Sequence, residues 1–382
     1  MDLRKARVLI TGSDGFIGKN LVLRLSEFDE LQTFCFKKQD SLADLNDYIK
    51  KCNFVIHLAG SNRSEDANDF KKNNIEFTKM LLEILSTEIQ TNKRIIPLIF
   101  TSSTQIDNDS NYGKSKLEAE SVIRKFSKEL KNPVKIYRLP GVFGKWCKPN
   151  YNSVVATFCS NIVNNLKIDI HDADKELLLV YIDDVIDSFI KSIVEFGSDN
   201  IDGIVNPQYK ITIKQLANIL QLFFEKRKNI EIEEVGSGLK RALYSTLISY
   251  LPTEDFSYPL KSNNDDRGNF VEMIKTKNSG QFSFFTAHPG ITRGGHYHHT
   301  KTEKFLVIKG EARFSFRHML SGATSELKTS GSVPEVVDTI PGWAHDITNI
   351  GDEDLVVMLW ANETFDKDKP DTISFEVKNE KN

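Results

Sequence analysis

Three histidines and one glutamate lie within the stretch GGHYHHTKTEKF, in a chain that contains only eight histidines. His296 and His298 are two positions apart, a spacing that points both side chains to the same face of a β-strand. Glu303 follows shortly after, and His345 comes later in PGWAHDITN. Three imidazoles and one carboxylate suit a divalent transition metal, and Zn²⁺ fits as well as any. We therefore predict a metal site at these four residues; a surface turn that binds metal only incidentally is the alternative.

A glycine-rich turn near the N-terminus indicates a second chemistry. VLITGSDGFIG places Gly12, Gly15 and Gly18 directly after an apolar run and directly before the helical pattern KNLVLRL. Glycines at this spacing let the backbone approach a pyrophosphate, and the N-terminus of the following helix offers unpaired N–H groups to the anion. The stretch predicts a dinucleotide site, with a purely structural turn as the alternative.

The residues after the second strand-like run, LQTFCF, indicate which dinucleotide binds. NAD-binding proteins carry an acidic residue there for the ribose 2′-OH, whereas this chain has Lys37 and Lys38. A cation at that point suits a 2′-phosphate, so we predict NADPH. Two lysines that are simply solvated are the alternative, and the nearby Asp40 leaves the other dinucleotide open.

NYGKSK places Tyr112 and Lys116 four residues apart, on one face of the helix expected there. An ammonium beside a phenol lowers the pKa of the phenol, which can then exchange a proton with an alkoxide near neutral pH. Together with the glycine turn, this pair makes residues 1 to about 245 resemble an extended short-chain dehydrogenase/reductase. The stretches HLAG, YRLPGVFG and YIDDV resemble further segments of that family.

The resemblance implies that Tyr112 donates a proton to a ketone oxygen and that Lys116 holds the cofactor ribose. In the family a serine after the fifth strand polarises the substrate carbonyl, and FTSSTQ matches it with Ser103. Ser102 is the alternative, because Tyr112 follows Ser103 by only nine positions where the family generally inserts a longer loop. Arg138 is expected to bind substrate. The expected cofactor contacts are Gly12, Asp14, Gly15, Phe16, Ile17, Gly18, Lys37, Lys38, Leu58, Ala59, Gly60, Asn74, Tyr112, Lys116 and Leu139.

The histidine stretch carries a resemblance of its own. Its spacing resembles the first cupin motif, and the segment around His345 resembles the second one more loosely. A deoxysugar 3,5-epimerase is the rival resemblance, in which Arg293 binds phosphate or substrate, His296 acts as the base and Lys304 stabilises an enolate. One imidazole cannot be metal ligand and base at the same moment, and the presence of Glu303 and His345 favours the metal.

The two halves, in this order and across essentially the whole chain, resemble the bifunctional epimerase/reductases of bacterial capsule and O-antigen synthesis. Those enzymes act on UDP-linked 4-keto-6-deoxy-N-acetylhexosamines on the route to N-acetyl-L-fucosamine. The resemblance implies epimerisation at C3 in the cupin, reduction at C4 to UDP-2-acetamido-2,6-dideoxy-L-talose, and a homodimer formed through the cupin. Three alternatives stay open: a ketoreductase whose cupin only binds sugar or mediates assembly, a metal-dependent isomerase whose dinucleotide cycles without net turnover, and a nucleotide-sensing regulatory protein.

The elements that must position these residues fall into two halves. Up to about residue 250, short β-branched runs alternate with helical patterns, which predicts βαβ units and a Rossmann-type parallel sheet. After a stretch rich in Pro, Asn, Asp and Gly, short alternating strands follow without a convincing amphipathic helix, which predicts an all-β cupin or jelly roll. We expect an α/β reductase domain over 1–245, a linker over 246–258 and the cupin over 259–382.

Length and composition agree with this division and disfavour other classes of protein. A chain of 382 residues exceeds what one hydrophobic core usually serves. A net charge of −3 lacks the basic surplus of a nucleic-acid-binding protein, and the longest apolar runs fall far short of the roughly 20 residues that span a bilayer. The four cysteines are far apart, which argues against disulfides. We expect a cytoplasmic protein that binds small molecules, and neither nucleic acid nor membrane.

Overall fold

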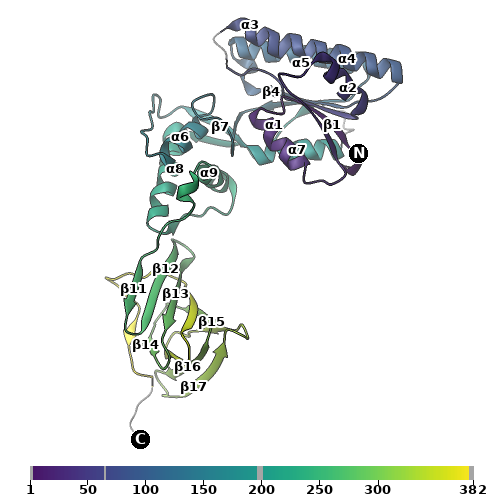
Figure 1. Cartoon of the computed structure of the whole chain (residues 1–382). Coiled ribbons are helices and arrows are strands. Elements are labelled where there is room, and N and C mark those ends of the chain that lie inside the picture. Colours follow the sequence, from purple (N-terminus) through teal and green to yellow (C-terminus); the bar gives the residue numbers. More distant parts are fainter. Residues whose placement is uncertain (1–2, 64–65, 196–200, 378–382) are drawn as a thin grey trace. The chain divides into compact units, whose positions relative to one another are not determined.

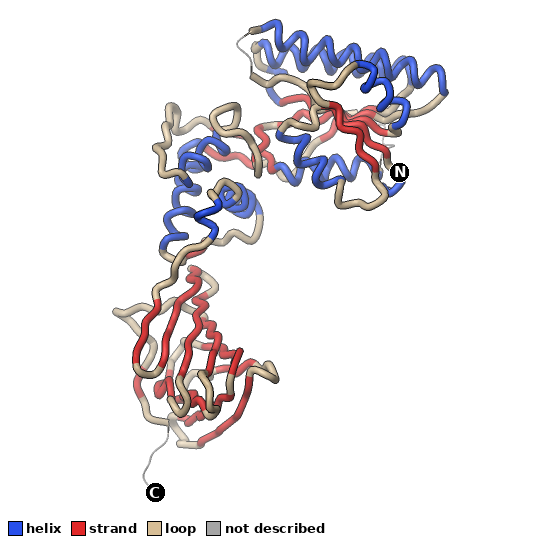
Figure 2. The backbone as a smooth tube through the Cα atoms, in the orientation of Figure 1, coloured by secondary structure: helices blue, strands red, loops and turns tan. Residues whose placement is uncertain are grey.

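The computed structural model divides into two compact units, each described here by itself. The residues it describes are 3–63, 66–195 and 201–377. The N-terminal unit comprises residues 1–220 and 238–251, and the C-terminal unit comprises 221–237 and 252–382. Helices and strands are mixed in the first unit, whereas the second consists almost entirely of strands (Figures 1 and 2).

A six-stranded sheet, in which every neighbouring pair is parallel, forms the centre of the N-terminal unit. Its strands are β1 (Arg7–Thr11), β2 (Gln32–Phe36), β3 (Phe54–His57), β4 (Leu98–Ser103), β5 (Val134–Leu139) and β8 (Asp202–Gly203). The order β2-β1-β3-β4-β5-β8 places β1 and β3 in the interior, so both read as apolar runs buried on two faces. The predicted Rossmann-type sheet is confirmed.

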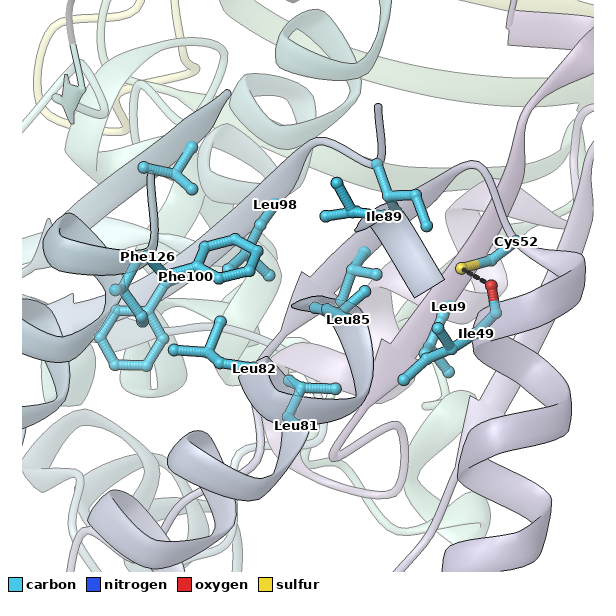
Figure 3. Close-up of a cluster of buried hydrophobic side chains, with 14 of the residues drawn as sticks. Leu9, Ile49, Cys52, Leu81, Leu82, Leu85, Ile89, Leu98, Phe100 and Phe126 are labelled. Carbon is cyan, nitrogen blue, oxygen red and sulfur yellow. Dashed lines mark hydrogen bonds between the residues drawn. The ribbon is translucent and has the colours of Figure 1, made fainter. Parts of the chain in front are cut away.

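Helices cover both faces of this sheet (Figure 1). On one face lie α2 (Leu42–Lys51), α4 (Phe77–Asn92) and α5 (Asn111–Leu130), and on the other lie α1 (Phe16–Leu25) and α7 (Ile182–Val194). Figure 3 shows the core beneath the first three helices, where Leu85 of α4 and Phe126 of α5 meet Leu9 and Leu98 of the sheet. This packing fixes α5, whose first turn carries Tyr112, on the sheet.

The remaining elements of the N-terminal unit are shorter. A small sheet has the order β6-β7-β9, with β6 and β7 parallel and β7 and β9 antiparallel. The bounds are η1 (Leu3–Lys5), α3 (Ala67–Phe70), the π-helix η2 (Lys71–Glu76), η3 (Thr104–Asp107), β6 (Gly141–Phe143), α6 (Val154–Val163), β7 (Glu176–Tyr181), β9 (Tyr209–Thr212) and α9 (Gly238–Ile248).

Two sheets form the C-terminal unit, and all of their pairs are antiparallel except that of β10 with β12. One has the order β10-β12-β13-β20-β15-β18 with β11 beside β12, and the other has the order β17-β16-β19-β14-β21. Side chains of both sheets share one core, including Phe285, Val357, Phe314 and Ile347. The predicted all-β domain is confirmed. The bounds are η4 (Thr253–Phe256), β10 (Glu231–Ile232), β11 (Ser262–Asp265), β12 (Gly268–Thr276), β13 (Gly280–Ala287), β14 (Thr292–Tyr297), β15 (Glu303–Lys309), β16 (Glu311–His318), β17 (Thr324–Ser330), β18 (Val336–Asp338), β19 (Trp343–Asn349), β20 (Leu355–Ala361) and β21 (Ile373–Ser374).

The division between the units differs in detail from the expected linker at 246–258. The helix α8 (Ile213–Lys228) begins in the N-terminal unit and ends in the C-terminal one, where β10 pairs with β12. The chain then returns to the N-terminal unit for α9, so the expected linker starts inside that helix. Helical periodicity reveals that α8 and α9 exist, but it does not reveal which core each turn packs against.

Two further expectations concern the chain as a whole. Over the described ranges, no helix is both long and apolar enough to cross a membrane. All four cysteines are unpaired. Burial raises the pKa of the Cys147 and Cys159 thiols above the ordinary value.

Candidate active sites

The glycine turn between β1 and α1 forms the floor of the first candidate site. Gly12 has a φ of +72°, and a Cβ there would lie 2.7 Å from the amide nitrogen of Ala59. A Cβ on Gly18 would lie 2.3 Å from the carbonyl oxygen of Gly12. Only glycine fits both positions, so the turn stays tight and the first turn of α1 lines a cavity. An exposed helix N-terminus of this kind fits the pyrophosphate of a dinucleotide.

This cavity has a volume of about 480 Å³ and lies at the carboxyl ends of β1, β3, β4 and β5, where open α/β sheets bind their ligands. The predicted residues that line it are Gly12, Asp14, Gly15, Phe16, Ile17, Gly18, Leu58, Gly60, Ser103, Tyr112, Lys116 and Leu139, and the alternative serine, Ser102, lines it as well. The predicted residues outside its lining are Lys37, Lys38, Ala59, Asn74 and Arg138. The glycine turn and the tyrosine-lysine pair therefore belong to one site.

Tyr112 and Ser103 face each other in this cavity. Ser110 caps α5 by accepting a hydrogen bond of 3.0 Å from the Gly113 N–H, which places Tyr112 in the first helical turn. Burial raises the pKa of Tyr112, and a hydrogen bond with Ser103 lowers it only in part. The lowered pKa expected from Lys116 is not found. The phenol is therefore protonated at neutral pH and placed to donate.

Lys116 is buried with its ammonium directed at the backbone. Its Nζ donates to the carbonyl oxygen of Thr101 at 3.0 Å and lies 4.9 Å from the ring centre of Phe100. Burial lowers the pKa of Lys116 to about 8, although the charge of Glu120 raises it in part. Nζ thus has the Thr101 carbonyl oxygen as its hydrogen-bond partner, while burial and Ser103 account for the shifted pKa of Tyr112.

Asn74 supports the cavity without lining it. It lies in the π-helix η2, a rare geometry that is frequent at functional sites. Its Oδ1 accepts a hydrogen bond of 2.7 Å from the Ser61 N–H, and its Nδ2 donates to Ser115 Oγ at 2.9 Å. A Cβ on Gly60 would lie 2.7 Å from the same Oδ1. Asn74 thus ties the loop after β3 to α5.

The two lysines after β2 have different surroundings. Lys37 Nζ lies 3.7 Å from Oδ1 of Asp14, which lines the cavity, whereas Lys38 is exposed to solvent. Asp40 accepts a hydrogen bond of 2.8 Å from the Lys37 N–H, so its carboxylate closes the turn that carries the lysines. One oxygen of the Asp40 carboxylate is therefore already engaged by the backbone.

The structure does not bring Arg138 into the cavity, contrary to the expectation that it binds substrate. Side chains alternate along β5, so Leu139 lines the cavity while Arg138 lies on the other face. There its Nε and Nη2 lie 3.0 and 2.8 Å from the two carboxylate oxygens of Glu120, whose side chain is only 2% exposed. In the parallel register Ser102 lies opposite Arg138, and Ser103 opposite Leu139. Both serines line the cavity, and Ser103 is the one whose side chain forms a hydrogen bond with Tyr112.

A loop that sequence reasoning overlooked closes one side of this cavity. KWCKPNYNS follows β6 and contributes Trp146, Lys148, Tyr151 and Ser153 to the lining. Trp146 has a φ of +67° and its ring is half exposed, while Lys148 Nζ lies 5.6 Å above the ring of Tyr151. The sequence signal that could have indicated this loop is the presence of aromatic residues in a polar loop at the carboxyl edge of a sheet.

The four predicted metal ligands come together inside the C-terminal unit, from β14, β15, β19 and the loop after β14. One ligand atom from each of His296, His298, Glu303 and His345 lies within 4.8 Å of the others. Nε2 of His298 and Nε2 of His345 lie 3.3 and 3.4 Å from Glu303 Oε2. Neither ring nitrogen of the buried His345 has a hydrogen-bond partner in the described structure. These clustered donors fit a divalent cation, because buried imidazoles are otherwise hydrogen-bonded.

The protonation states of the cluster agree with that fit. Burial lowers the pKa of His296 to about 4, so its imidazole is neutral at physiological pH, as ligation requires. Burial raises the pKa of Glu303, but His298, His345 and Lys301 together lower it below the ordinary value. The result is an ionised Glu303 carboxylate beside a neutral His296 imidazole.

Asp371, on the C-terminal segment before β21, holds the ligand loop in place. Its carboxylate accepts hydrogen bonds from the N–H groups of His299, Thr300 and Lys301 at 2.9, 2.7 and 2.8 Å. Its carbonyl oxygen accepts from Nδ1 of His298, which leaves Nε2 of that ring facing Glu303. Outer partners of this kind orient the ligands of metal sites.

A second cavity, of about 320 Å³, opens onto this cluster, and its lining contains one of the two basic residues that the sequence suggested for it. Arg293 lines the cavity as expected, with its buried Nε free of hydrogen bonds within the described structure. Lys304 does not line it: the residue after Glu303 on β15 faces outward, and its Nζ pairs with Asp338. The lysine inside is Lys301, whose Nζ lies 3.0 Å from Glu303 Oε1.

Fold and sites together define the class of protein. A dinucleotide-binding parallel sheet, with a tyrosine, a lysine and a serine at its carboxyl edge, is joined to a β domain with a three-histidine, one-glutamate cluster. Residues 8–206 match the NAD dependent epimerase/dehydratase family, and residues 263–373 match the polysaccharide biosynthesis C-terminal domain.

Known proteins resemble the chain over its length. It is 50% identical over 371 residues to the UDP-2-acetamido-2,6-beta-L-arabino-hexul-4-ose reductase of Pseudomonas aeruginosa, covering 97% of this chain and 99% of the relative. The crystal structure of the capsular polysaccharide assembling protein CapF from Staphylococcus aureus matches with a TM-score of 0.89 and 40% identity, over 97% of this chain and all of that one. The dTDP-4-dehydro-6-deoxyglucose reductase of Escherichia coli is 26% identical over 61% of this chain and 87% of its own. This chain belongs to the NAD dependent epimerase/dehydratase family, and in it that domain is followed by a polysaccharide biosynthesis C-terminal domain.

Proposed function

We propose that this chain is a bifunctional sugar-nucleotide enzyme that epimerises C3 of a UDP-2-acetamido-2,6-dideoxy-4-hexulose in its C-terminal unit and reduces C4 in its N-terminal unit. The product is UDP-2-acetamido-2,6-dideoxy-L-talose. One observation carries the proposal: Ser103, Tyr112 and Lys116 line a single cavity above a glycine-cradled helix N-terminus. The full-length similarity to a reductase named for a UDP-linked 4-keto sugar supports the substrate class.

The reductase half assigns a task to each of these three residues. Bound NADPH supplies the hydride that the ketone carbon accepts. Tyr112 donates its proton to the C4 oxygen, and its raised pKa keeps that proton available at neutral pH. Ser103 Oγ accepts a hydrogen bond of 3.1 Å from the Gln105 N–H, so its own hydrogen is directed to the tyrosine or the carbonyl oxygen. Lys116, which lines the cavity, would hold the cofactor ribose.

The preference for NADPH rests on charge at the end of β2. Lys37 lies outside the cavity lining but contacts Asp14, which lines it, and Asp40 accepts a hydrogen bond from the backbone of its own turn. A 2′-phosphate finds a cation here, whereas a 2′-hydroxyl finds no unengaged carboxylate from Asp40.

The epimerase half uses the second cavity. A divalent ion, for which Zn²⁺ is our first choice, supplies positive charge that polarises a sugar carbonyl. Lys301 adds a second cation beside the ligand cluster and takes the role that the sequence suggested for Lys304. Arg293 lines the same cavity and would bind an anionic or carbonyl oxygen there through its guanidinium. Stabilising negative charge on the C4 oxygen would make the C3 proton more acidic, so that a base other than the metal ligands takes it from one face and an acid returns a proton to the opposite face.

A ketoreductase with a purely structural cupin is the second candidate, favoured by the name of the Pseudomonas relative, which mentions reduction alone. Proton NMR of a UDP-4-keto-6-deoxy-N-acetylhexosamine in D₂O separates the two. Deuterium at C3 without NADPH, lost in His345→Ala, together with one reduced sugar after NADPH is added, is the result we expect. NADPH oxidation without exchange at C3 would leave the simple ketoreductase.

A further inference from the structure

A group of hydrogen-bonded polar side chains lies on the wall of the C-terminal cavity, apart from the ligand cluster. It consists of Glu272 on β12 with Gln281 and Ser283 on β13, and all three line the cavity. Gln281 and Ser283 are buried, with exposed fractions of 7% and 2%. Most of the remaining wall near them is apolar, formed by Phe270, Phe285, Phe305, Phe314, Leu359 and Phe365. A polar group in such a wall has a strong need for a partner.

The orientation of the Gln281 amide follows from its neighbours. The backbone N–H of Phe365 can only donate, and it lies 3.2 Å from Gln281 Oε1, so the amide oxygen faces Phe365. The amide nitrogen then donates its two hydrogens to Glu272 Oε1 at 2.9 Å and to Ser283 Oγ at 3.1 Å. The other carboxylate oxygen of Glu272 lies 2.9 Å from Lys275 Nζ, and this ion pair favours the ionised carboxylate, which can only accept the hydrogen bond from Gln281.

This arrangement determines what Ser283 can offer. Its oxygen accepts from Gln281, and this is its single hydrogen bond among the residues that the structure describes. The hydroxyl hydrogen is therefore left to donate, and the side chain lines the cavity. Ser283 is thus a neutral donor held in place by a fixed amide.

We propose that Ser283 recognises the acetamido carbonyl oxygen at C2 of the sugar and so selects 2-acetamido over 2-hydroxy sugars in the C-terminal unit. The inference rests on the proposed function, because it requires the keto-sugar to enter this cavity. The volume of about 320 Å³ is at the lower end for ligand pockets, and the lining of this one cavity includes both the ligand cluster and Ser283. The sugar ring and its substituents carry two carbonyl groups: the cations take the ketone at C4, and the acetamido carbonyl is left for Ser283.

The test compares two substrates and two serine variants by the rate of deuterium exchange at C3, using the full chain loaded with Zn²⁺. The substrates are UDP-4-keto-6-deoxy-N-acetylglucosamine and its 2-hydroxy counterpart, UDP-4-keto-6-deoxyglucose. Ser283→Ala should lose about tenfold in kcat/KM on the acetamido substrate, mainly through KM, because one neutral hydrogen bond is lost. On the 2-hydroxy substrate its rate should stay within about twofold of the unsubstituted protein.

Ser315→Ala is the matched control, because Ser315 on β16 is equally buried and does not line the cavity. It should leave the ratio of the two substrates unchanged. An equal loss on both substrates, or no loss on either, in Ser283→Ala would overturn the assignment of Ser283 alone. Absence of exchange in the unsubstituted protein on both substrates would overturn the proposed epimerase function as well, so the two failures are distinguishable.

Discussion

Replacing Lys116 by methionine should stabilise the N-terminal unit at neutral pH while it abolishes reduction. The ammonium is buried, and burial lowers its pKa from 10.5 to about 8. Such a shift means that the charged form of Lys116 has a higher free energy in the folded protein than in water. A buried charge of this kind is typical of functional sites. Methionine has a similar length and no charge to bury.

The size of the effect follows from that shift. A fall from 10.5 to about 8 corresponds to about 3 kcal/mol, at roughly 1.4 kcal/mol for each pKa unit. Methionine also loses the hydrogen bond of 3.0 Å to the Thr101 carbonyl, which costs about 1 kcal/mol. We therefore expect a net gain of about 2 kcal/mol in the free energy of unfolding at pH 7.

The same shift makes the gain depend on pH. Between pH 8 and 10.5 the unfolded chain still carries the Lys116 proton that the folded protein has lost, so this residue's contribution to stability rises with pH. Below pH 8 both states are protonated and the penalty is fully present. The advantage of Lys116→Met over the unsubstituted protein should therefore shrink as the pH rises from 7 toward 10.

Urea unfolding of the full chain without cofactor, followed separately for each unit by hydrogen exchange, measures this difference. Lys125→Met, on the same helix and 73% exposed, is the control and should change stability by less than about 0.5 kcal/mol. A Lys116→Met protein that is less stable at pH 7, or whose advantage does not change with pH, would refute the idea that burial of the charge dominates at this position.

Three further predictions concern the two sites. Gly18→Ala should lower the stability of the N-terminal unit by about 1 to 3 kcal/mol, measured by urea unfolding, because its Cβ would lie 2.3 Å from the Gly12 carbonyl oxygen; unchanged stability would contradict the tight turn. Tyr112→Phe should slow NADPH oxidation by about 10² to 10⁴-fold and leave deuterium exchange at C3 intact; equal losses in both reactions would argue against separate sites. Asp371→Ala should weaken Zn²⁺ binding by about 10 to 100-fold in competition with a chromophoric chelator, because the 299–301 loop loses its three backbone hydrogen bonds; Asp354→Ala, which removes an exposed partner of His288, should bind Zn²⁺ normally.

Local spacing was sufficient to predict the parts of each site that come from one element. Gly12 and Gly18 belong to a single strand-turn-helix unit, so their separation alone determines the geometry that the structure shows. Tyr112 and Lys116 lie four apart on α5, and His296 and Glu303 lie on consecutive strands. Both fold classes were likewise predictable, because the period of apolar residues changes between the two halves of the chain.

Tertiary structure decided which side chains enter the cavities. Lys304 and Arg138 have the right chemistry, but each lies on a strand next to a residue that faces a cavity, so alternation turns both away from it. Lys304 pairs with Asp338 instead, and Arg138 pairs with the buried Glu120. Lys301 lies in a loop, where alternation gives no guidance, and reaches the cluster through the turn that Asp371 holds.

The hydrogen-bond donor at Ser283 depends on residues that are even farther apart in the chain. The orientation of Gln281 is set by the backbone of Phe365, which is 84 residues away in the chain. The sequence by itself determined the chemistry available in each half, because short motifs act within one element. Which lysine, arginine or serine meets a ligand depends on strand register and on partners far apart in the chain, and these are determined only when the sheets pack.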